Sequence, residues 1–150
     1  MIKRFLSNTV LPMTFLAYAS MLLIPLEVFL SEPFPYQYIR ITIQAVKIGE
    51  PIQIQADLHR TKLCAYKVER TIHDSENTRI YYENVEPPTP TKLGSVSFVL
   101  PIEDYKAKST SAGLAVDRVR IGAMCNPLRR LFPLWGDYIT TEFYFLEPRK

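Results

Sequence analysis

Apolar and polar residues alternate with a period of two along most of the chain after residue 37. Ile39, Ile41 and Ile43 fall on one face of such a segment, and Arg40 and Thr42 fall on the other. Because successive side chains of a β-strand point to opposite faces, this alternation indicates half-buried strands. The pattern recurs in further segments separated by turn signals. The predicted strands cover residues 38–45, 52–59, 63–73, 79–85, 96–102, 114–125 and 138–147.

Short strands with one apolar face each predict an all-β fold in which two sheets pack together. The number of strands and the size of residues 38–150 favour a seven-stranded β-sandwich of the immunoglobulin or fibronectin-III style. A small closed barrel is the alternative architecture. Trp135 falls in a late loop and not on the third strand, so the resemblance is one of fold style and does not extend to antibody domains.

The first thirty residues have a different pattern, because a continuous apolar run replaces the alternation. Within residues 9–30 the only charged side chain is that of Glu27, and the run is long enough to cross a bilayer core of about 30 Å. Lys3 and Arg4 precede the run, and no basic residue follows it closely. The positive-inside rule then places residues 1–8 in the cytoplasm and the rest of the chain in the periplasm or outside the cell.

The sequence therefore predicts one N-terminal transmembrane helix, a signal anchor in the inner or plasma membrane, ahead of the sandwich. A cleaved signal peptide is the alternative, because residues 17–19 form a small-x-small motif, although the apolar run continues beyond them. Residues 31–37 contain two prolines and predict a stiff, extended stalk. The residues expected at the membrane interface are Lys3, Arg4, Glu27, Phe34 and Tyr36.

Cys64 and Cys125 are the only cysteines of the chain. Cys64 opens the third predicted strand and Cys125 closes the sixth, and a sandwich of this connectivity brings these two positions to the same end. An even number of cysteines in an extracytoplasmic domain favours a disulfide, whereas two free buried thiols would fit a cytosolic protein. Closing a loop of roughly sixty residues would contribute about 4 kcal/mol in the chain-entropy model.

The segment 125–135, CNPLRRLFPLW, combines two prolines, two adjacent arginines and five large apolar side chains. These apolar residues would not all lie in water, so the loop either caps the open end of the sandwich or presents an apolar patch to a partner. We expect Phe132 to belong to a cap, Trp135 to be partly exposed, and both arginines to point outward. The candidate partner-binding residues are Arg129, Arg130, Leu131, Phe132, Leu134 and Trp135.

Residues that would support catalysis or metal binding form no recognisable set. No serine lies in a G-x-S-x-G elbow, and the chain has no glycine-rich phosphate loop. His59 and His73 have no cysteine or carboxylate at metal-ligand spacing. The net charge is only +3, and basic and acidic residues are interleaved. These observations predict a protein that is not an enzyme, holds no metal or cofactor, and binds neither nucleic acid nor a small-molecule substrate.

The function expected from the sequence is that of a single-pass membrane protein whose β-sandwich is a protein-interaction or structural module of an envelope-associated assembly. Its partners would be the lipid bilayer, through residues 9–30, and another envelope protein or a second copy of the chain. A secreted or virion-type structural domain, such as a phage accessory protein, is the alternative. In that case the N-terminal segment would be a signal or a membrane-inserting segment.

Overall fold

A computed structural model describes residues 33–148 of the chain. The predictions made for residues 1–8 and 9–30, including those for Lys3, Arg4 and Glu27, fall outside the described residues. Among residues 33–148, no helix combines the length and the apolar character that a membrane crossing requires.

The described residues form mostly β-strands, as the alternation predicts. Each predicted strand corresponds to one long strand of the structure, with bounds that differ by a few residues. The long strands are β1 (Tyr36–Ile43), β3 (Ile52–Arg60), β4 (Ala65–His73), β5 (Arg79–Val85), β6 (Gly94–Ile102), β7 (Gly113–Met124) and β9 (Ile139–Leu146). The sequence did not predict four short elements, β2 (Val46–Lys47), the 3-10 helix η1 (Ala107–Ser109), α2 (Pro127–Leu131) and β8 (Leu134–Trp135).

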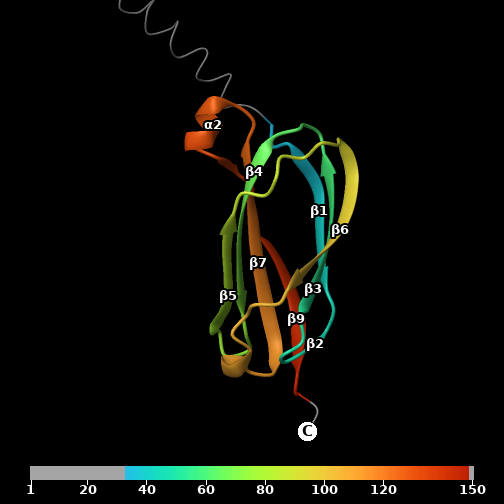
Figure 1. The fold of residues 1–150 in the computed structure, drawn as a ribbon, viewed down its shortest axis with the longest axis vertical. Helices are drawn as coiled ribbons and strands as arrows, with labels where there is room; N and C mark the ends of the chain where they lie inside the picture. The colour runs from blue at the N-terminus through green and yellow to red at the C-terminus, as the bar shows by residue number, and fades with distance from the viewer. Residues whose placement is uncertain (1–32, 149–150) are drawn as a thin grey trace, which may run out of the picture. The chain divides into compact units, whose positions relative to one another are not determined.

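The strands form two sheets, which Figure 1 shows as two layers. The first sheet has the order β1-β3-β6, and both of its pairings are antiparallel. The second sheet has the order β2-β9-β7-β4-β5, with β8 paired to β7. The chain passes from the first sheet to the second between β1 and β2, where β2 runs parallel to β9. Among the described residues, the first sheet has three strands and the second has six, so the first sheet is the narrower one.

The core lies between the two sheets. Ile52 and Ile54 of β3 are fully buried, while Gln53 and Gln55 between them are exposed, as the period of two requires. The larger apolar cluster joins residues of the first sheet, among them Ile43 and Ile102, to Ile72, Ile80, Phe143 and Phe145 of the second. A second cluster, formed by Tyr36, Leu58, Ile121 and Ala123, fills the other part of the interface. The prediction of two packed sheets is confirmed.

Strand pairing fixes which loops lie together. Arg60 at the end of β3 is paired with Gly94 at the start of β6, and Ala65 at the start of β4 is paired with Met124 at the end of β7. The loops 61–64, 86–93 and 125–133 consequently meet at one end of the domain, the end that carries α2 in Figure 1. The beginning of β1 lies at this end too, because Tyr36 is paired with Arg60.

Candidate functional site

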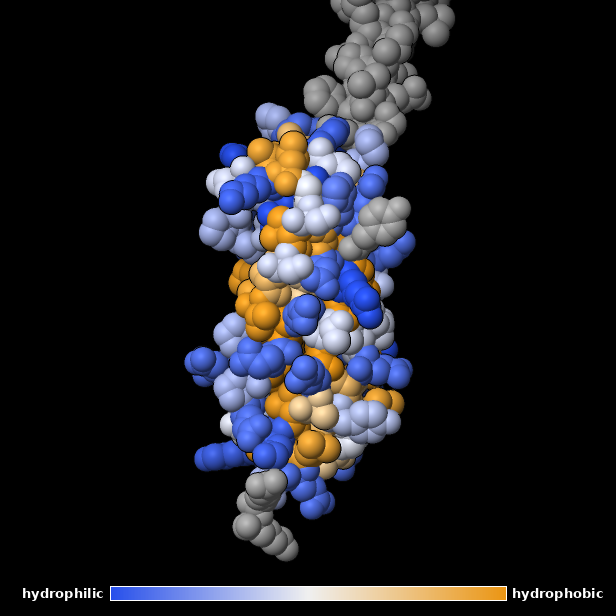
Figure 2. Space-filling model, turned by 90° about the vertical axis from the view of Figure 1, so that its right-hand side faces the viewer, coloured by the Kyte–Doolittle hydropathy of each residue, from blue (hydrophilic) through white to orange (hydrophobic). Residues whose placement is uncertain are grey.

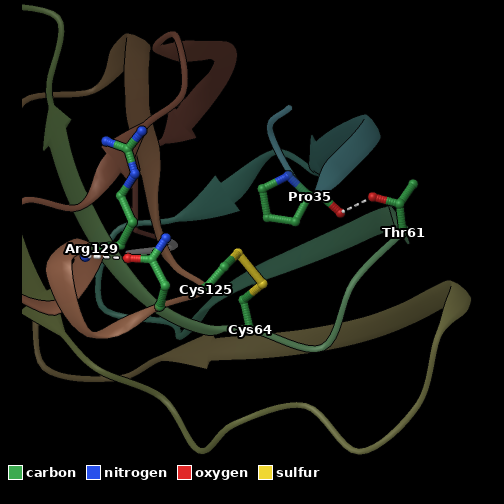
Figure 3. The surroundings of a disulfide bond; sticks show 6 residues. Pro35, Thr61, Cys64, Cys125 and Arg129 are labelled. Atoms are coloured by element: carbon green, nitrogen blue, oxygen red, sulfur yellow. Dashed lines mark hydrogen bonds between the residues drawn. A yellow bond between two sulfur atoms is a disulfide. The ribbon is translucent and has the colours of Figure 1, made fainter. Parts of the chain in front are cut away.

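The segment 125–133 is held by three local features. Cys64 and Cys125 form a disulfide that ties the start of β4 to the end of β7, in agreement with the predicted pairing (Figure 3). Asn126 is the N-cap of α2, since its Oδ1 accepts a hydrogen bond of 2.9 Å from the backbone N–H of Arg129. Pro127 follows at the first helical position, where a missing N–H costs nothing. The bridge and the cap together give α2 a fixed orientation on the end of the domain.

This orientation reverses two of the sequence expectations. Phe132 was expected to cap the sandwich, but 67% of its surface is exposed, next to Leu131 with 74% exposed. Arg129 was expected to point outward, but it is buried, whereas Arg130 is exposed as expected. The reason is the single turn of helix: it directs Arg129 toward the domain and carries the residues at its C-terminal end into solvent.

Leu134 and Trp135 follow α2 in the chain and form β8, and both are half-buried. Trp135 pairs with Gly122 of β7, and its ring covers the position where a glycine Cβ would stand, at 3.0 Å. The guanidinium carbon of Arg120 lies 4.4 Å from the centroid of the Trp135 ring and 4.9 Å from that of Tyr138. Arg120 also donates a hydrogen bond of 2.6 Å from Nε to Glu69. Trp135 is therefore held by a cation–π contact with Arg120, which the sequence did not suggest.

The two stalk residues that were expected at the membrane interface pack against the domain. Tyr36 is 5% exposed and makes edge-to-face contacts with Phe34 and Tyr66. Burial, together with the neighbouring Tyr66, raises the pKa of the Tyr36 hydroxyl to about 12. Phe34 is half-buried and lies against Gly136. The backbone oxygen of Pro35 accepts hydrogen bonds from Thr61, 2.9 Å from N and 3.0 Å from Oγ1 (Figure 3). Residues 34–37 are thus part of the folded domain and not a free stalk.

Exposed apolar side chains gather at the end that carries α2. Leu131 and Phe132 are joined there by Leu63 of the β3–β4 loop and Leu93 of the β5–β6 loop, both about half exposed. Figure 2 shows the side that lies on the right in Figure 1, away from α2, where an apolar patch is visible near the upper end. We call these four residues, Leu63, Leu93, Leu131 and Phe132, the tip surface.

A second feature is a cavity of about 460 Å³ between the two sheets, which we call the intersheet cleft. Its walls are largely apolar side chains from both sheets, for example Ile41, Leu58 and Phe98 from the first and Val68 and Ile121 from the second. It is bordered by Leu100 of β6 and Val85 of β5, which are 42% and 40% exposed although they face inward. These two strands are edge strands, so the cleft lies where the narrower sheet leaves the wider one partly uncovered.

Charged groups line one wall and one end of the cleft. Arg70 of β4 is 3% exposed, and its Nε lies 3.3 Å from Oδ1 of the fully buried Asp117 of β7. Burial raises the pKa of Asp117 to about 6. The neighbouring Arg70 acts to lower this pKa, and Glu83 acts to raise it. Neither carboxylate oxygen of Asp117 accepts a hydrogen bond within the described part of the chain. Arg60, at the end of β3, has a buried Nε that likewise has no hydrogen-bond partner.

Potential metal ligands do not cluster in residues 33–148: no group of three or more histidine, cysteine, aspartate or glutamate side chains could hold an ion there.

Comparison with known proteins gives no family. No family model matches the chain, and no curated protein matches it. Among solved structures, it is similar to the alkylpurine DNA glycosylase AlkC of Pseudomonas fluorescens bound to DNA containing an abasic site analogue. The match has 14% identity and a TM-score of 0.37, and it covers 73% of this chain but 29% of that chain.

This comparison corrects two exclusions made from the sequence, that the protein is not an enzyme and that it has no nucleic-acid partner. The glycosylase is an enzyme, and its structure contains DNA, so both exclusions are contradicted and withdrawn. They rested on missing motifs and on a small net charge, which describe the sequence and do not exclude a function. At this identity and TM-score the likeness carries no argument for either activity in this chain.

Proposed function

We propose that the chain is a membrane-anchored, extracytoplasmic interaction module of an envelope-associated assembly. Residues 9–30 would span the inner or plasma membrane, with residues 1–8 in the cytoplasm and the β domain in the periplasm or outside the cell. The domain would be a β-sandwich of the immunoglobulin or fibronectin-III style. Its sheet order, β1-β3-β6 facing β9-β7-β4-β5, supports that assignment, because it corresponds to two antiparallel sheets of three and four main strands.

The observation that carries the proposal is the exposure of Leu131 and Phe132 on a helix that is rigidly held. Large apolar side chains that are exposed side by side mark interaction sites in folded proteins. The disulfide and the Asn126 cap fix α2 before any partner binds. Because α2 is already ordered, binding of a partner fixes little additional chain, and the entropic cost of binding is lower. An exposed aromatic residue beside Arg130 also has the composition that is enriched in protein–protein interfaces.

The proposed anchor and the folded domain are close together in the sequence. Only two residues, Ser31 and Glu32, separate Leu30 from Pro33 in the sequence. The described chain begins at the end of the domain that carries the tip surface, because Tyr36 is paired with Arg60. The proposed partner is another protein of the envelope.

Photo-crosslinking with the full chain in its native membrane tests this proposal. A benzophenone amino acid at position 132 should give a discrete protein adduct, and the same group at Tyr144, an exposed residue of β9, should not. Leu131→Ser should abolish the adduct without lowering the melting temperature, since Leu131 is mostly solvent-exposed. Equal crosslinking at both positions, or adducts with lipid alone, would contradict a protein partner at the tip surface.

The mass of the mature N-terminus separates the anchor from the secreted alternative. An intact segment 1–30 supports the anchor, and its loss supports secretion. A periplasmic reporter fused after Lys150 should then be active, and activity of a cytoplasmic reporter at the same position would contradict the proposed orientation.

A further inference from the structure

The intersheet cleft is a partly open space of about 460 Å³ between the two sheets. That volume lies within the range of small-molecule binding sites, roughly 300 to 1,000 Å³. Its walls are mostly apolar, and a cavity of this kind gains little from water. An apolar occupant would restore the van der Waals contacts that the walls lack.

The polar groups of the cleft indicate the charge of the occupant. Four titratable side chains line it, Arg60, Tyr66, Arg70 and Glu83. Arg70 is paired with Asp117, and Glu83, which faces Arg70 across β4 and β5, would repel an anion. Arg60 forms no salt bridge with any described residue, and its Nε is buried without a hydrogen-bond partner. The end of the cleft at Arg60 is therefore the place where an anionic group would be stabilised.

A peptide strand is a poorer occupant than an acyl chain. The space between the sheets is walled by side chains, and the backbone groups of the inner strands are already paired within each sheet. A peptide backbone placed there would leave its own N–H and C=O groups unpaired, which is costly away from water. A hydrocarbon chain brings no such groups, and a carboxylate at one end matches the planar, forked donors of arginine.

We infer that the intersheet cleft binds one acyl chain of an amphiphile with an anionic head, with this chain between the sheets and the head at Arg60. A free fatty acid and a phospholipid that inserts one acyl chain share this chemistry. Leu100 and Val85 are partly exposed and border the cleft where the edges of β6 and β5 are free, so the chain would enter between these two strands. Residues of the tip surface do not line the cleft, and the inference therefore goes beyond the proposed function.

The test uses the full chain in membranes and a palmitic acid that carries a diazirine in its chain. Irradiation should attach the probe to peptides of β5, β6 and β1, and unlabelled palmitate should compete. Leu100→Trp should block the entrance and abolish this labelling. Arg60→Gln should lower labelling about tenfold or more, because it removes a charge-assisted hydrogen bond to the head. Arg118→Gln, an exposed position of β7, is the matched control and should leave labelling unchanged.

Each result decides one part of the inference. Labelling that persists in Leu100→Trp, or that falls only on residues 9–30, overturns the cleft as the site. Equal labelling of the native chain and Arg60→Gln overturns the position of the head. A phosphatidylglycerol with the same diazirine chain distinguishes the sources, since its labelling of the cleft supports an anionic membrane phospholipid and its failure supports a free fatty acid. An unchanged melting temperature and the absence of free thiols show that each variant is folded. Val85→Trp, on the opposite side of the entrance, repeats the test if Leu100→Trp does not fold.

Discussion

The buried carboxyl group of Asp117 should make the domain less stable as the pH rises. Asp117 is fully buried, and its oxygens accept no hydrogen bond from the described residues. Burial raises its pKa from 3.8 to about 6, although Arg70 favours the charged form. The folded domain consequently holds the proton more tightly than the unfolded chain does. The contribution of this group to stability is fully present below pH 3.8, and it is lost as the pH rises through 6.

The size of the effect follows from the two pKa values. Each pKa unit corresponds to about 1.4 kcal/mol, so a rise from 3.8 to about 6 corresponds to about 3 kcal/mol. Other carboxylates titrate over the same pH interval and also make the free energy of unfolding depend on pH. Asp117→Asn keeps the shape of the side chain and does not titrate. The free energy of unfolding of the native domain, minus that of Asp117→Asn, should therefore fall by about 3 kcal/mol between pH 3.5 and pH 7.

Urea unfolding of residues 34–150, followed by the fluorescence of the single tryptophan, Trp135, measures this difference at each pH. Glu142→Gln is the control, because Glu142 is exposed on β9 and its removal should not change the pH dependence in the same way. If the difference between the native domain and Asp117→Asn does not change with pH, the carboxyl group is not desolvated. A difference that rises with pH would mean that the ion pair with Arg70 outweighs burial, and it would refute the reasoning.

Two further predictions concern the framework of the tip. Without reductant, alkylation should detect no free thiol at Cys64 or Cys125, and Cys64→Ala should lower the free energy of unfolding by about 2 to 5 kcal/mol in urea titrations. Gly122→Ala should lower it by about 1 to 3 kcal/mol, because the added methyl group would stand 3.0 Å from Trp135 and from Pro133; an unchanged urea midpoint would show that β8 moves aside freely.

The strands could be predicted from the sequence because burial on one face imposes a period of two, which is a local property of the chain. Arg70 lies in the inward phase of the same periodicity, and the structure buries it. Asp117 could have been found in the same way, since it alternates with the buried Ala115 and Val119. The local pattern does not show that β4 pairs with β7, and this pairing brings the two charges together. The ion pair itself could therefore not be predicted.

The short elements and the cavity lie beyond such patterns for different reasons. β2 and β8 are two residues long, too short for any periodicity. Asn126 and Pro127 form a recognisable helix start, but only the five-residue length of α2 determines that Phe132 ends in solvent. The intersheet cleft depends on the relative widths of two sheets, which is a property of the assembled fold.

The tip surface and the intersheet cleft arise from separate structural causes, and they can therefore be tested separately. The tip surface depends on the Cys64–Cys125 bridge and on the cap of α2, both at one end of β4 and β7. The cleft depends on the topology of residues 33–148, in which no strand lies beyond β6 to cover β5. Since the two sites share no residue, a substitution at Phe132 should leave acyl labelling unchanged, and Leu100→Trp should leave crosslinking at position 132 unchanged. If either substitution affected both readouts, the two sites would be coupled, and binding in the cleft would have to alter the end of the domain that carries α2.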